Sequence, residues 1–144
     1  MTSATRRTKA EAGAADLAVR ADESPWTPAE LDEQTTVLRA DRTRLIAEIA
    51  DADKGLADLL IDSADSSGDD TADSGGKTFD REHELSLANN TRELLEQVER
   101  ALGRIDDGTY GSCESCGNPI GKARLQAFPR ATLCVPCKQR EERR

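Results

Sequence analysis

The chain has 144 residues, a formal net charge of −8 and only four aromatic residues. This is too little material for a large globular core, so we expect a mainly α-helical, elongated protein with a small metal-stabilised module. The acidic balance argues against nucleic-acid binding by general phosphate attraction, and no apolar run could span a membrane. Without an apolar segment after its basic N-terminus, the protein should be cytoplasmic, with reduced thiols.

Residues 1–25 have no sustained apolar stripe and are rich in Ala, Thr, Arg and Glu. This composition predicts a disordered N-terminal arm, with alanine favouring a helical turn within residues 10–20.

A helix start follows at "TPAEL". Thr27 can form the N-cap, Pro28 suits the first helical position, and Glu30 completes a capping box, with Trp26 placed for a hydrophobic staple. The residues after this start repeat with the period of a coiled-coil seam, which has weak positions at Thr35 and Arg42. The seam comprises Leu31, Leu38, Leu45, Ile49, Ala52, Leu56 and Leu59.

Residues 62–76 contain five aspartates and no basic residue. Within them, "SGDDTADSGG" (67–76) has no large apolar side chain and three glycines, which is typical of a flexible connection.

A second stripe of the same period follows and ends at "DDG", where Gly108 is the expected C-terminal cap. Two amphipathic helices joined by one connection most simply pack antiparallel, which predicts a hairpin over residues 26–108 with its acidic tip at 62–76. The alternative is a dimeric coiled coil, which the break at the connection disfavours. The second stripe comprises Leu87, Thr91, Leu94, Val98, Ala101 and Ile105, widened by Leu85, Leu95 and Leu102.

Residues 109–144 contain all four cysteines, in two C-x2-C pairs separated by seventeen residues. This spacing predicts one zinc ion bound by four thiolates, a closed structural site with no position for a substrate. Leu125 and Phe128 could form a small apolar base beneath it, whereas His83 reads as a solvated helix position. The predicted ligands are Cys113, Cys116, Cys134 and Cys137.

The C-terminal part is basic, which is compatible with contact to a protein or to phosphate. The simpler interpretation, which we favour, is a solvated C-terminal helix over 135–144 with cations near its negative end.

The segment "YGSCESCGNPIGKARLQAFPRATLCVPCK" (110–138), after a helical hairpin, resembles the DksA/TraR zinc-finger regulators of bacterial RNA polymerase. The resemblance covers about residues 28–142. It implies a hairpin that inserts into the secondary channel of the polymerase, where acidic tip residues alter initiation. Asp70 and Asp73 match the D-x-x-D part of the tip motif of DksA, and Gly75 stands where that motif has alanine.

The resemblance also implies a guanosine tetraphosphate site shared with polymerase. The matching positions are Gln97, Phe128 and Lys138, of which only Lys138 is basic, so we expect a weak response to that nucleotide.

Three functions remain to be compared. The first is a monomeric, non-enzymatic transcription regulator that binds RNA polymerase directly, with no membrane association and no sequence-specific DNA binding. The second is a zinc-ribbon nucleic-acid-binding protein that dimerises through its coiled coil, which leaves the acidic tip without a role. The third, an enzyme or redox protein, has no base–nucleophile pair or open metal site to support it.

Overall fold

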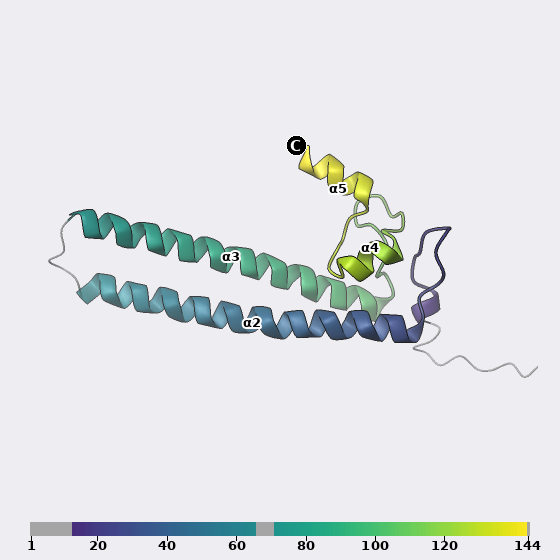
Figure 1. Ribbon diagram of the computed structural model, residues 1–144, viewed down its shortest axis with the longest axis horizontal. Helices are drawn as coiled ribbons and strands as arrows, with labels where there is room; N and C mark the ends of the chain where they lie inside the picture. The colour runs from purple at the N-terminus through teal and green to yellow at the C-terminus, as the bar shows by residue number, and fades with distance from the viewer. Residues whose placement is uncertain (1–12, 66–70, 144) are drawn as a thin grey trace, which may run out of the picture. The chain divides into compact units, whose positions relative to one another are not determined.

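The computed structural model describes residues 13–65 and 71–143. Two long helices, α2 (Pro28–Asp65) and α3 (Thr71–Asp107), precede two short ones, α4 (Lys122–Ala127) and α5 (Val135–Glu142). Figure 1 shows α2 and α3 side by side as an antiparallel hairpin. The chain forms two compact units: one combines residues up to Ala40 with Gln97–Arg144, and the other is Asp41–Glu96. We call them the zinc unit and the distal unit.

The start of α2 confirms the predicted capping box. The Thr27 backbone N–H donates to Glu30 Oε1 at 3.0 Å, and the Glu30 N–H donates to Thr27 Oγ1 at 3.1 Å. Two of the N–H groups that a helix start leaves without intrahelical partners are therefore satisfied by local side chains.

The distal unit contains the pairing of Asp41–Asp65 with the first part of α3. Leu45 and Ala88 are buried at its seam, and the remaining predicted α2 seam positions are half-buried. An ion pair of 2.5 Å between Arg92 Nη2 and Asp53 Oδ1 joins the two helices and shows which residues lie opposite each other. Both side chains are about half exposed, so this pair contributes little to stability.

The prediction of the second apolar stripe was wrong for the first turns that it covered. Leu85 and Leu87 are exposed, whereas Ala88 is buried. Counted back from Thr91, the heptad seam continues through Ala88 and Glu84. The prediction placed the seam at Leu87, one position away, because Leu87 is the large apolar residue there.

The predicted connection at 62–76 is shorter than expected. α2 continues to Asp65 and α3 begins at Thr71, so the flexible interpretation is wrong for 62–65 and 71–76. Asp70 lies outside the described residues, and Asp73 lies on the described backbone of α3.

The zinc unit has a core to which both its segments contribute. Leu38 of α2 and Val98 and Ala101 of α3 are buried, as are Trp26 and Tyr110, whose ring centroids lie 6.0 Å apart. Gly108 adopts a φ of 81° where α3 ends, which confirms it as the C-terminal cap. Among the described helices, none has an apolar stretch long enough for a bilayer crossing.

Residues 13–25 are ordered, against the prediction of a disordered arm over residues 1–25, of which residues 1–12 lie outside the described part of the chain. Residues 13–15 form a helical turn, and Ala14 and Leu17 are buried. The composition was misleading because this segment is held by contacts with residues far away in the sequence, polar ones among them. The carboxylate of Glu23 accepts hydrogen bonds from the backbone N–H groups of Lys122 and Ala123, at 2.9 and 3.0 Å.

Candidate metal centre

The first cysteine pair lies in a tight loop after α3. The Gly117 N–H donates to the Cys113 carbonyl at 3.0 Å, and the Cys113 N–H donates to the Asn118 carbonyl at 2.8 Å. Gly117 has a φ of 75°, in the left-handed region that glycine adopts without strain. The sequence C-E-S-C-G-N therefore folds back locally, which brings Cys113 and Cys116 to the same side of the loop.

The second pair lies at the start of α5. Cys134 is the N-cap residue, Pro136 occupies the first turn, and the Lys138 N–H donates to the Cys134 carbonyl at 2.9 Å. A bond of 2.9 Å from the Glu114 N–H to the Thr132 carbonyl joins the loop of the first pair to the segment before the second. This backbone bond holds the two cysteine pairs next to each other.

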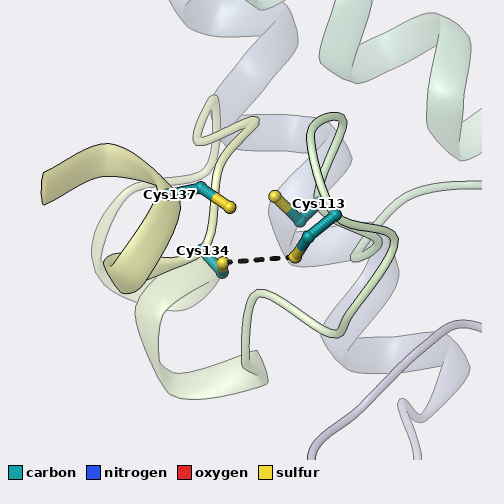
Figure 2. Close-up of side chains that lie close together, drawn as sticks. Cys113, Cys134 and Cys137 are labelled. Carbon is teal, nitrogen blue, oxygen red and sulfur yellow. Dashed lines mark hydrogen bonds between the residues drawn. The ribbon is translucent and has the colours of Figure 1, made fainter. Parts of the chain in front are cut away.

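The four predicted ligands come together. Their sulfur atoms all lie within 4.8 Å of one another, and the Cys116 and Cys134 sulfurs are 3.6 Å apart. Figure 2 shows the sulfur atoms of Cys113, Cys134 and Cys137 turned towards a common centre. Four thiolates around zinc, each about 2.3 Å from the ion, would stand about 3.8 Å from one another, so the cluster fits this metal.

The pKa shifts of the cysteine thiols also indicate that the cluster needs a cation when all four are ionised. Burial raises the pKa of the Cys113 thiol, but backbone N–H groups of Cys134, Cys116 and Ser115 outweigh this effect and lower it. The Cys137 backbone N–H lowers the pKa of Cys134, but burial and the neighbouring cysteine side chains raise it overall. Four adjacent thiolates cannot all be charged without a compensating cation, which zinc supplies.

The ligands have neighbours that the spacing of cysteines did not reveal. Arg140 Nη2 lies 3.2 Å from the Cys137 sulfur, where it supports the thiolate. Its place three residues after Cys137 on a helix was the signal that could have found it. Arg104 of α3 donates to the carbonyl oxygens of Ser112 and Thr109, which ties the end of α3 to the first cysteine loop.

A buried polar network fixes the module to α2. Gln34 is 4% exposed, and its Nε2 donates to Tyr110 Oη at 3.1 Å and to the Leu125 carbonyl at 2.6 Å. The Tyr110 hydroxyl donates to the Pro129 carbonyl at 2.7 Å. Burial raises the pKa of Tyr110 to about 12, so the hydroxyl stays a donor at neutral pH. Sequence gave no signal for Gln34, whose residue type is usually exposed.

The predicted apolar base beneath the metal is confirmed for one of its two residues. Leu125 is fully buried as expected, but Phe128 is 61% exposed. Phe128 is the C-cap of the six-residue α4, and the Arg124 guanidinium lies over its ring, 5.8 Å from the ring centroid. The ring therefore lies at the surface beside a cation and is not part of the module's core.

The positions matched to the nucleotide site lie together. Gln97, Phe128 and Lys138 line one open hollow of about 740 Å³ on the zinc unit. Lys138 is paired there with Glu141 at 3.7 Å. The predicted C-terminal helix is confirmed as α5, and His83 is exposed on α3 as expected.

Residues 108–143 match the sequence profile described as "Prokaryotic dksA/traR C4-type zinc finger". The chain is 45% identical over 75 residues to "RNA polymerase-binding transcription factor DksA" of Caulobacter vibrioides, covering 52% of this chain and 53% of that protein. It is 44% identical over 61 residues to the protein of the same name from Escherichia coli K12, covering 41% and 40%. The matched segments thus span about half or less of these relatives.

A solved structure extends the similarity. The transcription factor DksA2 from Pseudomonas aeruginosa superposes with a TM-score of 0.64 at 34% sequence identity, covering 80% of this chain and 84% of that one. The four-cysteine cluster, the helical hairpin before it and this similarity over most of both chains together place the chain in the DksA/TraR family of zinc-finger regulators.

Proposed function

We propose that this protein is a non-enzymatic bacterial transcription regulator that binds RNA polymerase and acts through the acidic tip of its hairpin. The observation that carries the proposal is the combination, in one chain, of a DksA/TraR-type zinc module and an acidic hairpin. Relatives that share the zinc module are named RNA polymerase-binding transcription factors. The protein would act in the cytoplasm, where bacterial polymerase is found.

The distal unit supplies the charge that such a role needs. Residues 41–96 contain fifteen acidic and six basic residues, a formal net charge of −9. Carboxylates near the connection could approach a bound magnesium ion or basic side chains in a channel of the polymerase. We assign the effector role to Asp70 and Asp73, and the zinc module would hold the hairpin's base in shape.

The decisive experiment compares binding to core RNA polymerase with promoter transcription in vitro. The double variant Asp70→Asn/Asp73→Asn should bind polymerase but no longer shift transcription. Asp51→Asn/Asp58→Asn is the matched control, because it removes the same charge from exposed positions of α2 in the distal unit. If the control loses the transcriptional effect as fully as the tip variant, the effect comes from net charge and not from the tip.

We further propose that guanosine tetraphosphate potentiates this protein weakly. Of the three positions matched to the family's nucleotide site, Gln97 and Phe128 bring no charge, and Lys138 is shared with Glu141. At these three positions a phosphate-rich ligand would lose charge-assisted hydrogen bonds, so the basic groups left to bind it in the hollow are Arg100, Arg124 and Arg130. A transcriptional response to the nucleotide as large as that of a DksA assayed in parallel would refute this proposal.

The alternative, a nucleic-acid-binding dimer, predicts a different set of observations. It requires helices from two chains, whereas Asp53 and Arg92 pair within one chain. Sedimentation should give a monomer, and duplex DNA should not bind at physiological salt. A stable dimer with steeply salt-dependent DNA binding would instead favour the alternative.

A further inference from the structure

The distal unit carries an exposed row of ring and aliphatic side chains on α3. Phe79, His83 and Leu87 are spaced four residues apart, so they lie on one face of the helix. Phe79 is 69% exposed and Leu87 is 47% exposed. The Phe79 and His83 rings are stacked, with centroids 6.5 Å apart and planes only 2° from parallel. Two rings are thus presented together at the surface.

Helix pairing does not explain this row. The seam of α3 passes through Ala88, which is buried, whereas the neighbouring Leu87 is exposed. Phe79 in particular is largely exposed, so little of its side chain contributes to the packing of the hairpin. Exposed apolar side chains gain free energy only when a partner covers them, so the row is better suited to an interface than to the free protein.

Charge narrows the choice of partner. The distal unit has a formal net charge of −9, which repels nucleic acid, anionic lipid and a second copy of itself. It attracts a basic protein surface. The exposed face of an aromatic ring also attracts a lysine or arginine, so the stacked rings and the surrounding carboxylates favour the same kind of partner.

We propose that Phe79, His83 and Leu87 dock into an apolar recess bordered by lysine or arginine side chains on RNA polymerase, which makes this row a second contact beside the tip. This inference rests on the proposed function. Phe79 lies six residues after Asp73 on the same helix, about 9 Å along its axis. A polymerase channel that encloses the tip from several sides would therefore reach the row as well.

The test is the affinity of the full-length, zinc-loaded protein for core RNA polymerase. Phe79→Ala should weaken binding about tenfold, the loss typical of truncating an aromatic interface anchor. Phe79→Trp should bind with about the affinity of the wild type. Phe79→Leu should have an intermediate affinity, because leucine fills a recess but offers no ring to a cation. Since the side chain is largely exposed, circular dichroism should be unchanged in all three variants.

Ile46→Ala is the matched control. Ile46 is 50% exposed on α2 of the same unit. It lies seven residues before Asp53, while Phe79 lies thirteen residues before its partner Arg92 on the antiparallel helix. The two sites are therefore about 30 Å apart along the hairpin. The control should bind within about twofold of the wild type, a change well below the tenfold effect of one anchor.

The outcomes separate the two proposals. If the wild type binds and Phe79→Ala binds equally well, or if Ile46→Ala weakens binding as much, the docking row is refuted and the proposed function stands. If the wild type does not bind polymerase at all, the proposed function fails and the docking row fails with it.

Discussion

The buried hydrogen bonds of Gln34 make a stability prediction that the structure quantifies. In Gln34→Leu, the new side chain has similar size and is better suited to burial. However, the Leu125 carbonyl and the Tyr110 hydroxyl each lose the donor that reaches them at 2.6 and 3.1 Å. Tyr110 keeps its own bond to the Pro129 carbonyl, so its loss is partial. One fully orphaned carbonyl and one weakened hydroxyl should cost about 2 kcal/mol after the apolar gain.

The control is Gln126→Leu, the same substitution in the same unit. Gln126 Nε2 also makes a side-chain hydrogen bond, to Glu30 Oε2 at 3.2 Å, but at an exposed position. Water replaces that bond, so the loss should be below about 0.5 kcal/mol.

The assay is urea unfolding followed by fluorescence of Trp26, which is the only tryptophan and lies 6.0 Å from Tyr110. Bound zinc should be measured in each variant, so that the two midpoints are compared at equal metal occupancy. Equal midpoints for Gln34→Leu and Gln126→Leu would refute the reasoning, because burial would then make no difference to the cost of losing the bond.

Three further predictions follow from the zinc unit. Cys113→Ser should release zinc and unfold the module, because metal binding and folding are coupled in such sites; unchanged zinc content and circular dichroism would contradict this. Gly111→Ala should destabilise by several kcal/mol, since its new Cβ would lie 2.7 Å from the Ala18 carbonyl oxygen at a φ of 104°. Gly103→Ala on α3, where nothing lies close to the new Cβ, should instead stabilise the protein by about 0.5–1 kcal/mol. In thermal melts, a Gly103→Ala variant no more stable than the Gly111→Ala variant would contradict this. Tyr110, the only tyrosine, should titrate at a pKa of about 12 when followed by absorbance. Because folding raises this pKa, the stability of the protein should fall as the pH rises from about 10 through 12. A phenol that titrates near 10 in the folded protein would be inconsistent with its burial.

Sequence succeeded where a feature depends on residues close together in the chain. The two close cysteine pairs, the capping box of Thr27 and Glu30, and the end of α3 at Gly108 depend on local spacing, and the structure has the four-cysteine cluster, the cap and the helix end where they were expected. Periodicity located both helices for a related reason, since a seam repeats over many turns.

Features that depend on contacts between distant residues were not predictable. Glu23 looked like part of a disordered arm, yet its carboxylate accepts N–H groups about a hundred residues later. Gln34 is an ordinary surface residue by type and becomes buried only because Tyr110 and Leu125 supply its partners. At Leu87 the pattern offered two registers one residue apart, and only the packing of α2 against α3 decides between them.

The discontinuous make-up of the zinc unit has a consequence for how the protein is made. Its first segment ends at Ala40 and its second begins at Gln97, with the four cysteines all in the second. During synthesis the distal unit, which is one uninterrupted segment, can pair its helices first. The early segment around Glu23 must wait for Lys122 to emerge, so metal capture and the closing of this unit come late. A shortage of zinc in the cell would therefore stall the nascent protein at a half-finished stage, with a formed hairpin and a loose base.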